Sequence, residues 1–134
     1  MAVSEETWQR LIAAAAEASV NAHAPYSGFH VGAALLTPDS EIVVGCNVEN
    51  ATFGATVCAE RNALANAVVR GEKEFIALAV ITPADHPVAP CGICRQVLAE
   101  FCDDLDILMV TESGLRLHVT LEELLPHRFT SKDF

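Results

Sequence analysis

The sequence predicts an α/β protein in which helices flank a five-stranded mixed sheet, giving three α/β/α layers. Two observations predict this class. Helical and strand-like patterns follow one another in the order α-β-β-α-β-α-β-β-α, which is typical of one sheet covered by helices. Residues 75–81 form a continuous apolar run, as expected for a strand buried on both faces. The length of 134 residues suits one domain, residues 1–134, with a single core.

The first helix is expected over residues 4–23. Ser4 is a suitable N-cap, and two glutamates follow it at the positive end of the helix dipole. The apolar residues that share one helix face are Trp8, Leu11, Ile12 and Ala15. The sequence Pro25-Tyr26-Ser27-Gly28 then breaks the helical pattern.

A β-hairpin is expected next, with strands over residues 31–37 and 41–48 joined at Pro38-Asp39-Ser40. Residues 49–57 have the composition of a loop. Two further helices are expected, one before and one after the buried strand in the sequence. They are residues 58–70, with Gly71 as the C-cap, and residues 91–101, entered through Pro90 after a proline-rich loop over residues 82–90.

The last third of the chain completes the sheet. Residues 106–110 and 116–119 are strand candidates on either side of a turn. Thr120 and Glu123 have the spacing of a capping box for a short helix that stops at Pro126.

Composition excludes several classes of partner. The net charge is −10, from 18 acidic and 8 basic residues, so nucleic acids and anionic membrane surfaces are disfavoured and a neutral small molecule fits better. Half of the residues are hydrophobic and the mean hydropathy is +0.32, which indicates that some apolar surface is buried between subunits. Five cysteines without a visible targeting or membrane-spanning segment indicate a cytoplasmic protein with metal-binding thiols.

Three cysteines have the spacing of a metal site. Cys91 and Cys94 form a C-x-x-C pair at the start of one predicted helix, and Cys58 stands at the start of another. Helix N-termini favour thiolates at these positions. Three protein ligands leave the fourth tetrahedral position of zinc open for water, which is the pattern of a catalytic site. Zinc can lower the pKa of bound water to about 7 and so supply hydroxide at neutral pH.

Two residues beside Cys58 add to this prediction. Glu60 can stand next to the zinc-bound water without ligating the metal, and can serve as a general base and then a general acid. Three thiolates on Zn²⁺ leave a net charge of −1, which Arg61 can offset by donating hydrogen bonds to sulfur.

These motifs resemble a known family. The sequence contains Cys58-Ala59-Glu60-Arg61, then Pro90-Cys91-Gly92-Ile93-Cys94-Arg95-Gln96-Val97-Leu98, and upstream Asn47-Val48-Glu49-Asn50-Ala51-Thr52-Phe53-Gly54. They strongly resemble the small homotetrameric, zinc-dependent cytidine deaminases, and the resemblance extends from about residue 25 to residue 126. It implies hydrolysis of cytidine and deoxycytidine to uridine, deoxyuridine and ammonia, by hydroxide attack on C4 of the base.

The resemblance also implies the roles of individual residues. The three cysteines would bind one zinc ion per chain, Glu60 would shuttle protons, and the backbone at Ala59 would contact the base.

The other implied contacts involve the nucleoside. Asn47 and Glu49 would hold the ribose 3′-hydroxyl, and Phe29 would pack against the pyrimidine. Phe53 and Phe129 would reach the site of a neighbouring subunit in a homotetramer. Relatives often carry tyrosine at the position of Phe53, and the phenylalanine here lacks the hydroxyl and any hydrogen bond made through it.

Alternative interpretations remain at this stage. The same zinc chemistry would serve a deaminase of a nucleoside antibiotic such as blasticidin S, or a polynucleotide-editing deaminase, although the acidic charge disfavours the second. A non-enzymatic zinc-stabilised module would need a fourth protein ligand, for which Cys46 is the candidate. Cys46 and Cys102 are otherwise expected to be small buried hydrophobic residues, and the five histidines to be structural or on the surface.

Overall fold

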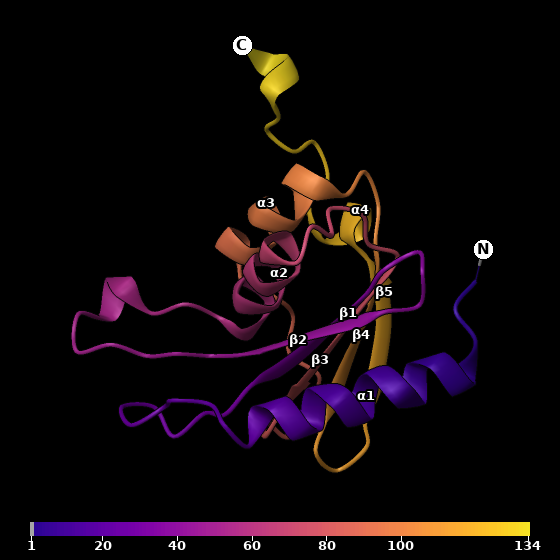
Figure 1. Ribbon diagram of the computed structural model, residues 1–134. Helices are drawn as coiled ribbons and strands as arrows, with labels where there is room; N and C mark the ends of the chain where they lie inside the picture. Colours follow the sequence, from indigo (N-terminus) through magenta and orange to yellow (C-terminus); the bar gives the residue numbers. More distant parts are fainter. Residues whose placement is uncertain (1) are drawn as a thin grey trace.

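The computed structural model describes residues 2–134 and contains a five-stranded sheet with the order β2-β1-β3-β4-β5 (Figure 1). The strands are β1 (Gly32–Leu36), β2 (Ile42–Cys46), β3 (Ala77–Thr82), β4 (Asp106–Thr111) and β5 (Arg116–Thr120). Strands β3 and β4 are parallel, and the other neighbouring pairs are antiparallel. The predicted mixed sheet of five strands is therefore confirmed.

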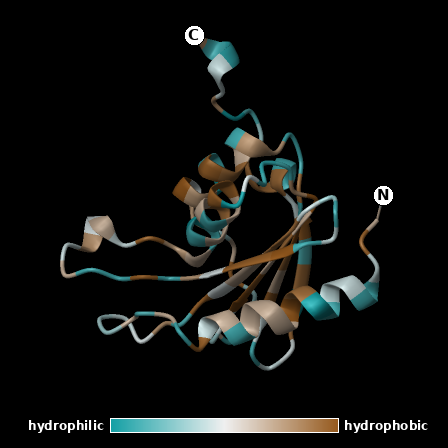
Figure 2. Ribbon diagram, in the orientation of Figure 1, coloured by the Kyte–Doolittle hydropathy of each residue, from teal (hydrophilic) through white to brown (hydrophobic). Residues whose placement is uncertain are grey.

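Helices cover both faces of this sheet, as the sequence predicted. Helix α1 (Glu5–Ser19) packs on one face, and α2 (Ala59–Val69), α3 (Gly92–Phe101) and the short α4 (Leu121–Leu124) pack on the other (Figure 1). Each face of the sheet has its own apolar core. Figure 2 shows hydrophobic residues in the strands, which lie between the two helical layers. Within residues 2–134, no helix has the length and apolarity needed to cross a membrane.

Helix α1 begins as predicted but ends earlier. Ser4 is its N-cap and accepts a hydrogen bond from a backbone N–H of the first turn at 3.1 Å. The predicted end at His23 is wrong, because the helix stops at Ser19. The backbone of His23 instead bonds to two residues that follow β2 in the chain. Its N–H donates to Asn47 O at 3.0 Å, and its carbonyl oxygen accepts from Glu49 N at 2.8 Å.

The segment after β2 is also more structured than predicted. Strand β2 ends at Cys46, and not at residue 48, because Val48 leaves the β1 ladder and exchanges two hydrogen bonds with Val57. Within the predicted loop 49–57, Phe53–Ala55 forms a single 3₁₀ turn. The remaining strand ends lie within two residues of the predicted ones, and the starts of β4 and β5 match them.

Local signals set several other helix ends as predicted. Gly71 has a φ of +86° after α2, and the N–H groups of Gly71 and Glu72 donate to Val68 O and Ala67 O, which is a Schellman motif. The capping box of Thr120 and Glu123 is present at the start of α4.

The position of α2 is fixed by close contact with the edge strand β2. Asn62 and Asn66 on α2 donate side-chain hydrogen bonds to the carbonyl groups of Cys46 and Val44 at 2.8 and 3.1 Å. Gly45 lies between these two carbonyls. A methyl group added there would lie 2.3 Å from the backbone nitrogen of a residue in α2, so only glycine permits this approach.

Candidate metal centre and its cavity

The N-termini of α2 and α3 bring three sulfur atoms together. Cys58 is the residue before α2, Cys91 is the residue before α3, and Cys94 lies in the first turn of α3. Their Sγ atoms all lie within 4.8 Å of one another. The Cys58–Cys91 and Cys91–Cys94 sulfur separations are 3.9 and 3.3 Å. The structure therefore assembles the three cysteines that the sequence singled out.

This group fits a tetrahedral zinc ion. Zinc–sulfur bonds of about 2.3 Å at tetrahedral angles place two thiolates roughly 3.8 Å apart, close to the observed separations. Among the described residues, the group contains three ligands and no histidine, and Cys46 is not part of it. The closed four-cysteine arrangement is thus not formed. Cys46 is also partly exposed rather than buried, which corrects the expectation for that residue, whereas Cys102 is buried as expected.

The ionisation of closely spaced cysteines favours a cation among their sulfur atoms. Interaction with the Cys94 thiol, together with Arg61, lowers the pKa of Cys58, and the pKa of Cys94 is raised because Cys58 and burial oppose its ionisation. Neighbouring sulfurs at this distance do not all ionise readily without a compensating positive charge. A divalent ion supplies that charge.

Arg61 supports the sulfur group from α2. One of its terminal nitrogens donates to Thr56 O at 3.2 Å and to Cys58 Sγ at 3.7 Å. Its Nε is buried and has no hydrogen-bond partner within the described chain. A partly exposed guanidinium group that donates to a cysteine sulfur is suited to balance thiolate charge.

Glu60 is a buried carboxyl group next to the metal group. It lies in the first turn of α2 and is only 5% exposed. Burial raises its pKa to about 7, and the nearby Cys58 contributes in the same direction. A carboxyl group with a pKa near neutrality can both accept and return a proton at physiological pH.

A cavity of about 410 Å³ opens in front of these groups. Several of the predicted site residues line it, and they are Phe29, Asn47, Glu49, Cys58, Ala59, Glu60 and Cys91. Sequence reasoning missed the others, which are Ser27, Val31, Thr56, Val80, Thr82, Val88 and Ala89. Val80 and Thr82 come from the carboxyl end of β3, where it runs parallel to β4. This is the end of an α/β sheet at which ligands bind, so the predicted strand held a signal for Val80, whereas Thr82 fell in the predicted loop over residues 82–90.

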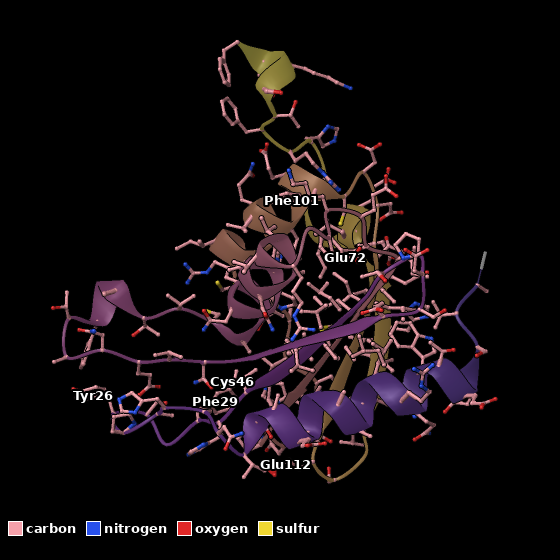
Figure 3. The ribbon with its side chains drawn as sticks, in the orientation of Figure 1. Tyr26, Phe29, Cys46, Glu72, Phe101 and Glu112 are labelled. Atoms are coloured by element: carbon pink, nitrogen blue, oxygen red, sulfur yellow. The ribbon has the colours of Figure 1, made fainter. Side chains whose placement is uncertain are left out.

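Asn47 orders the wall of the cavity. It is buried, its Oδ1 accepts from Val31 N at 2.9 Å, and its Nδ2 donates to Phe29 O at 2.8 Å. Figure 3 shows Phe29 on the connection between α1 and β1. The side chain of Asn47 therefore fixes the backbone on both sides of residue 30.

Phe53 and Phe129 lie apart from this cavity. Phe53 is 74% exposed, packs edge-on against Tyr26, and lines an adjoining hollow of about 240 Å³ that shares Ser27, Glu49 and Thr56 with the main cavity. Phe129 is 61% exposed and lies on the C-terminal segment, which projects from the body of the molecule (Figure 1). Within residues 2–134, Phe129 lines neither hollow.

Known proteins similar to this chain include members of a zinc-binding family. A family model described as the cytidine and deoxycytidylate deaminase zinc-binding region matches residues 5–110, which contain the three cysteines and Glu60. A cytidine deaminase from Halalkalibacterium halodurans is 45% identical over 126 residues, which cover 93% of this chain and 96% of the relative.

Two further comparisons concern the fold and the substrate class. A crystal structure of cytidine deaminase from Burkholderia pseudomallei matches with a TM-score of 0.89 and 42% identity, covering 95% of this chain and 100% of that chain. A blasticidin-S deaminase from Bacillus cereus is 33% identical over 112 residues, covering 75% of this chain and 77% of that protein. The fold comparison agrees with the three-layer architecture described above.

Proposed function

Because the chain belongs to the cytidine and deoxycytidylate deaminase family, we propose that it hydrolyses free cytidine and deoxycytidine to uridine, deoxyuridine and ammonia. The observation that carries this proposal is the position of Glu60. Its buried carboxyl group lies beside three clustered cysteines and faces a cavity large enough for a small-molecule ligand.

Cys58, Cys91 and Cys94 would hold the zinc ion of this zinc-dependent deaminase. Zinc supplies, when bound, a water molecule acidic enough to act as a nucleophile at neutral pH. Arg61 donates to the Cys58 sulfur and offsets the excess negative charge of three thiolates, which keeps the centre electrophilic.

Glu60 moves the protons of the reaction. It accepts a proton from the attacking water and delivers it to N3 of the pyrimidine while C4 is attacked. It then takes the proton of the hydroxyl group now on C4 and passes it to the amine, so that the C4–N bond breaks, ammonia leaves and C4 becomes a carbonyl carbon. In the metal-free chain, burial raises the pKa of the Glu60 carboxyl group, which favours its holding and returning a proton.

The cavity walls orient the nucleoside. Phe29 packs against the pyrimidine ring, and the backbone of Ala59 contacts its polar edge. Asn47 and Glu49 hold the ribose 3′-hydroxyl. Supporting these assignments, all four residues line the cavity that contains Glu60.

Purified protein should decrease the cytidine absorbance band, and a zinc chelator should abolish the decrease. Deoxycytidine and blasticidin S are assayed in parallel. Preference for cytidine and deoxycytidine supports the proposal. Preference for blasticidin S would instead assign the chain to the antibiotic-deaminating branch, and no turnover of any of them by zinc-loaded protein would contradict the proposal.

Assembly is the second part of the proposal. We propose a cytoplasmic homotetramer in which Phe53 and Phe129 complete the sites of neighbouring subunits. These side chains are highly exposed in one chain, as is Phe134 at 90%, and an isolated subunit would leave them in water. Three clustered cysteines that serve as metal ligands rather than as disulfide partners fit a reducing compartment.

Mixing two inactive variants, Glu60→Gln and Phe129→Ala, under conditions of subunit exchange tests this assembly. Some interfaces in mixed tetramers would combine an intact Glu60 with an intact neighbouring Phe129, so activity should return. Absence of recovery despite demonstrated exchange, or a fully active monomer in light scattering, would contradict it.

A further inference from the structure

The carboxylate of Glu49 is already bound by the loop that precedes β1. Its Oε1 accepts hydrogen bonds from Tyr26 N at 3.0 Å and Ser27 N at 3.1 Å, and its Oε2 accepts one from the hydroxyl of Ser27. These contacts join residues that are 22 and 23 positions apart in the sequence. The cavity wall at Glu49 is therefore built by two separate segments of the chain.

The number of bonds leaves little free capacity on this carboxylate. An ionised carboxylate offers about four acceptor positions, two on each oxygen. Both positions of Oε1 and one of Oε2 are used, so one acceptor position remains, on Oε2. The Ser27 hydroxyl also lowers the pKa of Glu49, which favours the ionised, acceptor-only form. Glu49 is thus prepared to accept one further hydroxyl group.

The same Ser27 hydroxyl also orders Phe29. Phe29 N donates to Ser27 Oγ at 2.9 Å, which closes a serine turn over Gly28. Gly28 has a φ of +67°, a conformation that glycine adopts without steric cost. One hydroxyl therefore accepts from the backbone of the base-packing residue and donates to the carboxylate that faces the sugar.

We propose that Ser27 is a positioning residue that holds Phe29 and Glu49 together in a preformed nucleoside site. The proposal rests on the proposed deaminase function and adds a residue whose role is to align the contacts to base and sugar. Ser27 and Glu49 line both the main cavity and the adjoining hollow, so the link lies at the point where a bound nucleoside would extend beyond the metal centre. Preformed contacts reduce the ordering cost of binding, so loss of the hydroxyl should weaken substrate binding more than it slows chemistry.

The test compares Ser27→Ala with Ser4→Ala in zinc-loaded protein. Ser4 is a matched control, because its exposed hydroxyl also accepts from a backbone N–H and donates to a side chain, but at the N-terminus of α1. Ser27→Ala should raise KM for cytidine on the order of tenfold, with a smaller change in kcat and unchanged zinc content. Ser4→Ala should leave both kinetic constants unchanged, and Ser27→Thr, which keeps a hydroxyl, should restore most of the affinity.

Two further measurements separate positioning from a general structural role. The effect of Ser27→Ala on kcat/KM should shrink severalfold with 3′-deoxycytidine as substrate. It should also shrink in a Glu49→Ala background, because the carboxylate through which it acts is then absent. The proposal would be overturned if Ser27→Ala lowered kcat/KM equally for cytidine and 3′-deoxycytidine and equally with and without Glu49. It would also be overturned if Ser27→Ala had the same kinetics as Ser4→Ala. Absence of cytidine turnover by the unmodified protein would instead contradict the deaminase function itself.

Discussion

Gly45 stands where β2 passes closest to α2, and a methyl group at this position should disturb the metal centre from a distance. An alanine Cβ would lie 2.3 Å from Ala63 N and 2.5 Å from Ala59 O, which are both backbone atoms. Ordinary contact is about 3.5 Å, so α2 must move away by roughly 1 Å. Overpacking of this kind typically costs about 1–3 kcal/mol of stability.

The displaced helix carries Cys58 at its start and Glu60 in its first turn. A misplacement of about 1 Å can lower turnover on the order of a hundredfold. Gly45→Ala should therefore weaken zinc affinity and lower kcat, in addition to destabilising the fold.

Gly32→Ala is the matched control on the opposite face of the sheet. Its added methyl group would lie 1.8 Å from Ala15 O in α1, away from the three cysteines. The assay combines urea unfolding, zinc transfer to a chromophoric chelator, and cytidine turnover. Both variants should lose stability, but Gly45→Ala alone should lose zinc affinity and kcat beyond its loss of folded protein. Equal effects of the two variants on the zinc site, or a normal site in Gly45→Ala, would refute this reasoning.

Three further perturbations have defined outcomes. Cys91→Ala should release zinc and lower the melting temperature, as measured by elemental analysis and thermal unfolding, and retention of one zinc per chain would contradict its role. Arg61→Gln should lower kcat more than it lowers the zinc content, and should shift the pH profile of kcat to higher pH. An unchanged pH profile would mean that Arg61 has a structural role only. In metal-free protein, the pKa of Glu60 is raised by burial from 4.5 to about 7, so its contribution to stability is lost as pH rises through this window. In urea unfolding, the free energy of unfolding of Glu60→Gln should rise by roughly 3 kcal/mol relative to that of wild type between pH 4 and pH 8. A difference between the two proteins that stays constant with pH would contradict the assigned pKa.

Features that depend on neighbouring residues could be predicted from the sequence. The capping box at Thr120, the Schellman glycine at position 71 and the apolar strand β3 each follow from a few adjacent side chains. Cys91 and Cys94 could be paired because C-x-x-C at a helix start places two sulfurs together without tertiary information, whereas Cys58 is identified from its own predicted helix start and from the family resemblance.

Features created by tertiary contacts could not be predicted in the same way. Helix α1 ends early because the backbone of His23 pairs with residues beyond β2, and no local signal marks that pairing. The contribution of Thr82 to the cavity depends on the order of strands in the sheet. Ser27 lies in the helix-breaking sequence Pro25-Tyr26-Ser27-Gly28, but its contact with Glu49 joins segments 22 residues apart and therefore has no local signal.

The most direct test of the account is cytidine turnover by zinc-loaded Glu60→Gln protein. The glutamine preserves the size of the side chain but cannot shuttle protons, so kcat should fall by about 10²-fold to 10⁴-fold, with one zinc per chain retained. Glu112→Gln, at an exposed position in the turn after β4, serves as the control and should behave like wild type. Turnover by zinc-loaded Glu60→Gln within a few fold of wild type would contradict the central claim that this buried carboxyl group carries the proton transfers.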